Sequence, residues 1–496
     1  MNFEHHTVSF LAFTHWCKRG LGLALLSLVM ACGGGGGGSS SANTSAPTLS
    51  LTNASLNLAP FYPSKPVFLL PTYTSGSAKI TWVDGSGATQ TLTLDKSGNL
   101  VQVNPLVTTE YTLAVTYQDP TQVRTNLLTA TQKLTVTVTP EAVTPVTIDL
   151  AGNMITGRSD HTAVRLPQAG GPVLVCGGTD GTDVLKSCEL YNPSTETWTA
   201  TGDMTTARRG HVATLLASGK VLVTGGYDGK LALATAEVYD PSSGVWTATI
   251  GPMNGTRRFH TATLLSDGKV LVAGGVVGPL QTADPLSTDL YNPATGLFTA
   301  YAAGSGLALP EARQGHTATL LSNGKVLFVG NSGVGTAAAK LLTYNSATPT
   351  NSTWAATGAM INTRYNHSAV VLDDNSVLVT GGFGADPKSA EIYTPGTDTW
   401  GSATGMTQAR ALHTSTKLLN GKILVAGGYD GTKSLNTIEI YTPSSNTWTA
   451  PSASKVLNTA RAMHTSTLLN DGDVLMVGTY YQSSGAISKT TELWRY

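Results

Sequence analysis

Apolar and polar positions alternate with a period of two in many short segments of this chain, as in Leu49-Ser50-Leu51 and Tyr111-Thr112-Leu113. This alternation is typical of β-strands with one buried face. No long stretch shows the 3.6-residue period of an amphipathic helix. Glycine is abundant, and Thr, Ser, Val and Leu dominate the rest, which suits short strands joined by tight turns. The pattern predicts an all-β protein.

The first 46 residues differ from this pattern. Lys18 and Arg19 precede an apolar run that ends at Cys32, which predicts a secretory signal over residues 1–31. Val29-Met30-Ala31-Cys32 resembles the bacterial lipobox, and the resemblance implies that Cys32 is lipidated. Residues 32–46 then form a Gly/Ser tether. Gly33 after the cysteine implies sorting to the outer membrane, so we expect a lipid-anchored protein of the bacterial cell envelope, on the periplasmic or the outer side. The alternative is plain secretion with cleavage elsewhere.

Residues 47–141 carry alternating segments at the spacing of a small β-sandwich, with Trp82 expected between its sheets. The segment Thr108-Thr109-Glu110-Tyr111-Thr112-Leu113 resembles a late strand of bacterial immunoglobulin-like modules. That resemblance implies an immunoglobulin-like domain that acts as a spacer.

From Met154 onward the chain repeats itself every 46 to 56 residues, which is the strongest signal in the sequence. Each repeat opens with an arginine three residues before a histidine. The pairs are Arg158/His161, Arg208/His211, Arg257/His260, Arg313/His316, Arg364/His367, Arg410/His413 and Arg461/His464.

An apolar strand and a glycine doublet follow each pair, except that Gly330-Asn331 and Gly478-Thr479 break the doublet. Two aromatic positions come next. The first is held by Tyr191, Tyr239, Tyr291, Tyr344, Tyr393, Tyr441 and Trp494, and the second by Trp198, Trp246, Phe298, Trp354, Trp400 and Trp448. This set of anchors resembles the kelch repeat, which implies a seven-bladed kelch-type β-propeller of four-stranded blades over residues 146–496.

The seventh repeat lacks a segment for its outermost strand. Residues 146–154 align with the segment that ends at Met204, with Ile148 in the place of the tryptophan. We expect this segment to supply the missing strand and to close the ring, because a closed propeller leaves fewer open edges.

The recurring charged residues are predicted to be scaffold. All seven histidines after residue 15 occupy one repeat position, and a residue required by every repeat is more often structural than catalytic. An acid precedes the first aromatic by two residues in six repeats, at Glu189, Glu237, Asp289, Glu391, Glu439 and Glu492, with Leu342 as the exception. We hypothesise buried or half-buried ion pairs between these acids and the repeat arginines.

Only Cys176 and Cys188 remain once Cys17 and Cys32 are assigned to the leader and the lipid anchor. Neighbouring strands and an oxidising compartment favour a disulfide between them over a redox pair or a metal site. We find no GxSxG, HExxH or CxxC pattern, so the sequence predicts no catalytic residues, no metal site and no cofactor.

Charge is balanced, with 30 basic and 30 acidic residues, and only 12% of residues are charged. This composition argues against a partner held by basic patches, nucleic acid in particular. The length of 496 residues indicates two or three units, and we expect a monomer.

If the repeats are scaffold, function lies where they differ. The two residues between each arginine and histidine vary freely, and in kelch folds they share a face with the loops after the glycine doublets. This face is predicted to carry the ligand-binding candidates Arg209, Arg258, Tyr365, Tyr227, Asp228, Tyr429, Asp430, Tyr480 and Tyr481. Asp228 and Asp430 also begin Asp-Gly turns.

Two functions remain open. The first is an envelope-anchored binding or scaffold protein that engages a protein or a glycan. The second is a carbohydrate-active envelope enzyme, either a sugar epimerase or mutarotase or an oxidase-like enzyme, since a propeller fold does not fix function. Copper chemistry of the galactose-oxidase kind needs histidine ligands and a tyrosine crosslinked to a cysteine, whereas here the histidines are repeat positions. An acid beside Arg209, Arg258 and Tyr365 in one pocket would favour catalysis.

Overall fold

A computed structural model of the protein describes residues 49–53, 67–73, 77–83, 89–94, 101–103, 109–118, 127–136, 147–277, 286–331, 339–450, 456–479 and 487–495. The chain forms two compact units, Met1–Thr144 and Pro145–Tyr496, which are described separately. The predicted signal, Cys32, the tether, and Tyr480 and Tyr481 lie outside the described residues.

The described residues of unit 1 form two antiparallel sheets. One has the order β1-β2-β5 and the other the order β4-β3-β6-β7, and β1 contacts β6 and β7. The strands are β1 (Leu49–Asn53), β2 (Val67–Tyr73), β3 (Ser77–Val83), β4 (Thr89–Leu94), β5 (Val101–Val103), β6 (Thr109–Gln118) and β7 (Leu127–Val136). Ala78 and Ile80 on β3 are buried and Lys79 between them is exposed, as the alternating pattern predicts.

Unit 2 contains seven four-stranded antiparallel sheets within its described residues. The first strands are β9 (Thr162–Arg165), β13 (Val212–Leu215), β17 (Thr261–Leu264), β21 (Thr317–Leu320), β26 (Ser368–Val371), β31 (Thr414–Lys417) and β35 (Thr465–Leu468). The second strands are β10 (Val173–Cys176), β14 (Val221–Thr224), β18 (Val270–Ala273), β22 (Val326–Val329), β27 (Val377–Thr380), β32 (Ile423–Ala426) and β36 (Val474–Val477).

The third and fourth strands complete each sheet. The third strands are β11 (Cys188–Asn192), β15 (Ala236–Asp240), β19 (Thr288–Asn292), β23 (Lys340–Thr343), β29 (Ala390–Thr394), β33 (Ile438–Thr442) and β37 (Thr491–Arg495). The fourth strands are β12 (Thr197–Thr201), β16 (Val245–Ala248), β20 (Leu297–Tyr301), β24 (Thr353–Ala356), β30 (Thr399–Ala403), β34 (Thr447–Thr449) and β8 (Thr147–Ala151). The remaining elements are β25 (Arg364–Tyr365), β28 (Phe383–Gly384) and two 3₁₀ turns, Pro349–Asn351 and Pro443–Ser445.

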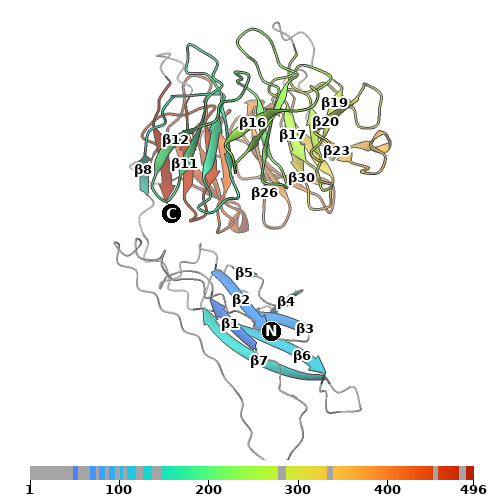
Figure 1. The fold of residues 1–496 in the computed structure, drawn as a ribbon, viewed down its shortest axis with the longest axis vertical. Helices are drawn as coiled ribbons and strands as arrows, with labels where there is room; N and C mark the ends of the chain where they lie inside the picture. The colour runs from blue at the N-terminus through green and yellow to red at the C-terminus, as the bar shows by residue number, and fades with distance from the viewer. Residues whose placement is uncertain are drawn as a thin grey trace, which may run out of the picture. The chain divides into compact units, whose positions relative to one another are not determined.

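The sheets form a closed ring. Each first strand contacts the first strand of the next sheet, and β35 of the last sheet contacts β9 of the first. In Figure 1 the early strand β8 lies beside the late strands of the chain, with which it completes a sheet. Ile148 of β8 is the partner of Trp494 of β37, as Trp198 is the partner of Tyr191 in the first sheet. The prediction that this early segment supplies the outer strand of the last repeat is confirmed.

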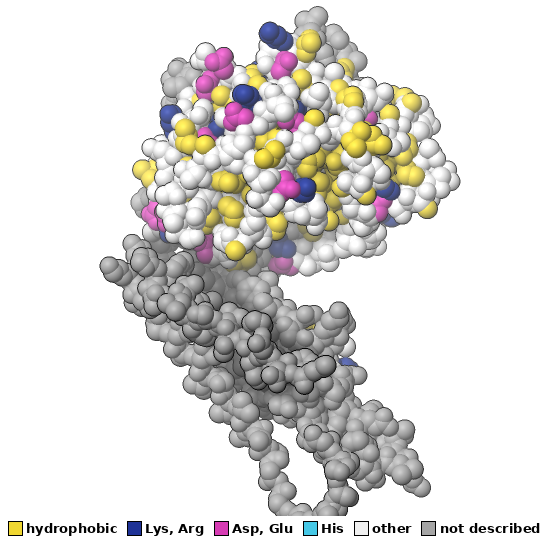
Figure 2. Space-filling view, in the orientation of Figure 1, with side chains coloured by type: hydrophobic (Ala, Val, Ile, Leu, Met, Phe, Trp, Pro, Cys, Tyr) yellow, Lys and Arg dark blue, Asp and Glu magenta, His cyan; other side chains and the backbone are white. Residues whose placement is uncertain are grey.

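The core lies between neighbouring sheets. The second strand of every sheet is buried along its whole length. Leu174 and Cys176 of the first sheet, for example, pack in one cluster with Val221 and Val223 of the second. The two aromatic positions of a repeat form ring pairs with centroids 4.9–5.3 Å apart in five sheets. The visible face of unit 2 shows few, scattered charged side chains (Figure 2), in keeping with the low charge content.

Candidate functional site: the mouth of the propeller

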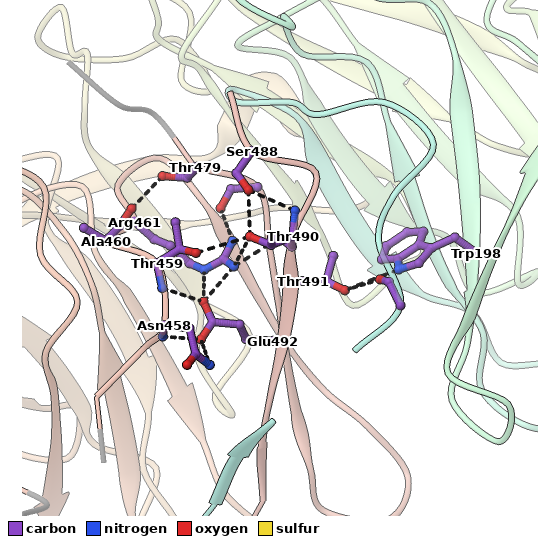
Figure 3. A network of polar contacts seen from close by, with 12 residues as sticks. Trp198, Asn458, Thr459, Ala460, Arg461, Thr479, Ser488, Thr490, Thr491 and Glu492 are labelled. Atoms are coloured by element: carbon purple, nitrogen blue, oxygen red, sulfur yellow. Dashed lines mark hydrogen bonds and ion pairs between the residues drawn. The ribbon is translucent and has the colours of Figure 1, made fainter. Parts of the chain in front are cut away.

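The repeat arginines and acids form the predicted buried ion pairs. In six repeats an arginine Nη2 lies 2.5–2.8 Å from the acid on the third strand, and both partners are at most 2% exposed. Figure 3 shows the last of these sites, in which Arg461 donates from Nε and Nη2 to Glu492. Glu492 also accepts the backbone N–H groups of Asn458 and Thr459. The Nη1 of Arg461 donates to the carbonyl of Gly478. Each pair therefore joins the loop that enters a sheet to its second and third strands.

The fourth repeat departs from the predicted alignment. Leu342, and not Tyr344, is the partner of Trp354 and of Val326, so Leu342 takes the place of the first aromatic. Lys340 then stands where the other repeats carry the acid, and Glu311 pairs with both Lys340 (2.9 Å) and Arg313 (3.4 Å). The assignment of Tyr344 was wrong because the acid and the aromatic that define the register are both replaced here.

The seven histidines join neighbouring sheets. The Nε2 atom of each lies 2.8–3.1 Å from a threonine Oγ1 of the preceding sheet, and His161 closes the series on Thr465 of the last one. Burial, aided by nearby arginines, lowers the pKa of His211, His316 and His464 to about 3. These imidazoles are neutral parts of the scaffold.

The glycine doublets allow this close packing. Gly177 has a positive φ of 65°, and a Cβ there would lie 2.5 Å from the Arg208 carbonyl oxygen. Cys176, just before the doublet, is joined by a disulfide to Cys188, its direct cross-strand partner. Both cysteines are buried.

The second of the two variable residues in each repeat adopts a left-handed conformation, with φ between 50° and 60°. Because these seven residues precede the first strands, which contact one another around the ring, they lie around one end of the propeller axis. They are Asp160, Gly210, Phe259, Gly315, Asn366, Leu412 and Met463. Backbone hydrogen bonds link five of the seven neighbouring pairs, for example from Gly210 N–H to Asp160 C=O and from Phe259 N–H to Gly210 C=O. We call this ring and the side chains around it the mouth.

The first variable residues pair with the loops after the glycine doublets, as predicted. β-Bridges join Arg209 to Tyr227, Arg258 to Val276 and Ala411 to Tyr429. Both groups of loops therefore belong to the same face of the propeller.

A cationic cluster occupies the mouth at the second and third sheets. The guanidinium carbons of Arg209 and Arg258 lie 5.4 and 4.9 Å from the ring centre of Tyr227, and Arg258 also lies 5.6 Å from that of Phe259. The Asp160 carboxylate is 3.8 Å from Arg209, beyond hydrogen-bond range. Burial raises the pKa of Asp160, although Arg209 and Arg258 oppose the shift.

An aromatic cluster occupies the mouth at the fifth and sixth sheets. Phe383 lies with its ring centre 5.2 Å from that of Tyr365 and 6.3 Å from that of Tyr429. Within the described residues, no contact joins this cluster to the arginines. Arg209 and Arg258 are therefore brought together with an acid beside them, and Tyr365 is not part of that group.

The two candidate aspartates hold turns. Asp228 accepts the N–H groups of Lys230 and Leu231, and these backbone hydrogen bonds lower its pKa. Asp430 accepts those of Thr432 and Lys433 in the same way. The hydroxyls of Tyr227 and Tyr429 donate to carbonyls of their own loops. Their aromatic faces, and not their polar atoms, are what these tyrosines offer a ligand.

Sequence reasoning did not name Asp160, Phe259 or Phe383 as site residues. The signal for the ring was present, because Gly, Asn and Asp, the residues that best tolerate a positive φ, hold four of its seven positions. The described residues contain no group of three or more His, Cys, Asp or Glu arranged to hold a metal ion. None of the helices among them is long and apolar enough to cross a membrane.

Comparison with known proteins agrees with the fold. Residues 315–496 match the KLHDC2/KLHL20/DRC7 Kelch-repeats domain, and residues 168–205 and 208–248 match the Kelch motif. The predicted kelch-type β-propeller is confirmed. No curated protein sequence matches the chain.

Two solved structures match the chain at low sequence identity, and the first of them shares its fold. A fungal alcohol oxidase of the AA5 family, in complex with copper, is 18% identical with a TM-score of 0.56, covering 70% of this chain and 75% of its own. YjhT is 14% identical with a TM-score of 0.46, covering 60% and 98%. At these identities the likeness concerns the fold alone.

Proposed function

We propose that this chain is a binding or scaffold protein of the bacterial cell envelope, whose kelch propeller engages a protein ligand at the mouth. The chain contains kelch repeats, which commonly mediate protein–protein binding. Tethering by a lipid on Cys32, with unit 1 as an immunoglobulin-like spacer, is part of the same proposal.

One observation carries the proposal. The histidines, the repeat arginines and their acids are used up in contacts that recur around the ring, whereas the mouth is the place where the repeats differ. It combines two arginines with aromatic rings, the residue types that most often dominate binding energy at protein interfaces. A face with these residues is suited to bind a partner rather than to stabilise the fold.

Site-specific crosslinking tests this proposal. We place a photoreactive residue at Gln314 or at Tyr365, which both hold first variable positions. The control is a photoreactive residue at Thr247, which is exposed on the outer strand β16. All variants are compared in living cells. We expect the mouth positions to crosslink to the same protein and Thr247 not to do so. A product from Thr247 alone, or none from the mouth, would contradict the proposal.

The anchor has its own test. We expect the wild-type protein to incorporate labelled palmitate and to fractionate with membranes, and Cys32→Ala to do neither. A Cys32→Ala protein that remains in the membrane fraction would refute lipid anchoring without touching the role of the mouth.

A further inference from the structure

Arg258 is the exception among the buried arginines of this protein. Among the described residues, eight arginines are at most 9% exposed, and the seven repeat arginines in this group all pair with a carboxylate. Arg258, at 9% exposure, has no carboxylate within ion-pair distance among the described residues. Its Nε has no hydrogen-bond partner, as is also the case for Arg208 and Arg410, so the missing carboxylate is what distinguishes Arg258. A guanidinium at this exposure has lost part of its hydration without an ion pair to offset the loss.

The surroundings of Arg258 hold it in place without neutralising it. Its guanidinium lies near the rings of Tyr227 and Phe259, and Tyr227 also contacts Arg209. Cation–π contacts stabilise such a group but leave its N–H donors free. The cluster carries two positive charges and the single negative charge of Asp160.

Asp160 is a poor partner for this pair of arginines. Among the described residues, its one ion pair is the 3.8 Å approach to Arg209, and none of them donates a hydrogen bond to its carboxylate, which is 11% exposed. Asp228, by contrast, accepts two backbone N–H groups. The burial that raises the pKa of Asp160 indicates that its charge is incompletely compensated.

We propose, building on the proposed function, that Arg258 and Arg209 form a receptor for the carboxylate of an acidic side chain on the protein partner, and that Asp160 is an internal competitor which this carboxylate displaces. A carboxylate suits the site because its two oxygens match the planar N–H fork of a guanidinium. A resident carboxylate already lies beside the cluster. An arriving one neutralises the charge that Asp160 leaves uncompensated.

The test measures fluorescence polarisation of labelled hexaglutamate and hexaglutamine peptides with the full-length protein. We expect the hexaglutamate to bind and the hexaglutamine not to bind. Binding is expected to weaken at least tenfold in Arg258→Gln and to strengthen severalfold in Asp160→Asn, since asparagine also tolerates the positive φ of residue 160. Lys220→Ala, which removes an exposed charge at the opposite end of β14 from the glycine doublet, is the control and is expected to bind as wild type does.

Two further variants and one further ligand complete the test. Arg258→Lys keeps the charge but loses the fork, so we expect intermediate binding. A misfolded variant would lose binding, so stronger binding by Asp160→Asn can only come from the removal of its charge. Weaker or unchanged binding by this variant overturns the role of Asp160. Equal binding of both peptides, binding of neither, or binding of trigalacturonate in preference to hexaglutamate overturns the receptor assignment. If crosslinking from the mouth succeeds while hexaglutamate does not bind, the proposed function stands and this inference fails.

Discussion

At the scale of single residues, stability and binding depend on different arginines. The guanidinium of Arg410 is buried against Glu439, which also accepts the N–H groups of Thr407 and Gln408, so every polar atom of that carboxylate is satisfied. Arg258 is buried with no such partner among the described residues. The first arrangement fixes a loop to a sheet, and the second leaves donors for a ligand.

Glu439→Gln tests the scaffold ion pairs. Neutralising the acid leaves Arg410 as a buried, unpaired charge, and breaking such a pair typically costs about 3–5 kcal/mol. We expect a clear fall in the urea midpoint monitored by tryptophan fluorescence. Lys186→Ala, which removes only an exposed pair with Asp203, is the control and is expected to change little. Equal midpoints for both variants would show that the buried pairs are not structural.

The histidines predict a loss of stability in mild acid. Their folded-state pKa lies far below the unfolded value of 6.5, so the unfolded chain takes up protons first as the pH falls. Stability is thus fully present above about pH 6.5 and decreases toward pH 3, by up to about 1.4 kcal/mol per histidine for each pH unit. Urea midpoints at pH 7, 6 and 5 measure this slope. His464→Asn is expected to flatten it, and identical midpoints at pH 7 and pH 5 would contradict the account.

At the scale of elements, the closed ring depends on the sheet in which β8 pairs with β37, which we call the seam. The first and last described parts of unit 2 meet where β8 pairs with β37, and Arg495 on β37 forms ion pairs with Asp149 of β8 and with Glu196 of the first sheet. Ile148 packs in the cluster that contains Trp494, whereas Leu150 on the same strand is largely exposed.

Paired substitutions on β8 test the seam. Ile148→Asp places a charge in the cluster around Trp494 and is expected to lower the stability of the propeller by about 2 kcal/mol or more. Leu150→Asp introduces the same charge on the same strand, at a side chain of which 62% is already in solvent. We expect little change from it. Equal effects in thermal unfolding would mean that β8 does not hold the ring closed.

The disulfide joins the second and third strands of the first sheet, across a sequence separation of 12. In the loop-entropy model a bond closing a loop of this size contributes about 3 kcal/mol. We expect Cys176→Val with Cys188→Ala to lower the urea midpoint, and dithiothreitol to lower that of the wild type to a similar extent. If dithiothreitol leaves the urea midpoint of the wild type unchanged and the double variant has the same midpoint, the disulfide contributes nothing to stability.

Much of this fold could be predicted from the sequence because its determinants recur. Each arginine, acid and glycine doublet is repeated, so Ile148 could be aligned with the tryptophans before any coordinates. The fourth repeat misled because Lys340 and Leu342 replace the acid and the aromatic that mark its register. The contacts of Arg258 could not be predicted, since Tyr227 and Phe259 meet it from different loops whose conformations depend on the assembled ring.

At the scale of the whole molecule, the account assigns stability to the repeated interior of the ring and recognition to its variable mouth. The most direct test is the dissociation constant of the crosslinked partner. It is measured for full-length wild type, for Arg209→Ala with Arg258→Ala, and for Lys220→Ala with Lys269→Ala. The second double variant removes two lysine charges that precede second strands β14 and β18, at the opposite end of these strands from the glycine doublets. The account predicts at least tenfold weaker binding for the arginine variant and unchanged binding for the lysine variant. Equal affinities for wild type and the arginine variant would contradict it.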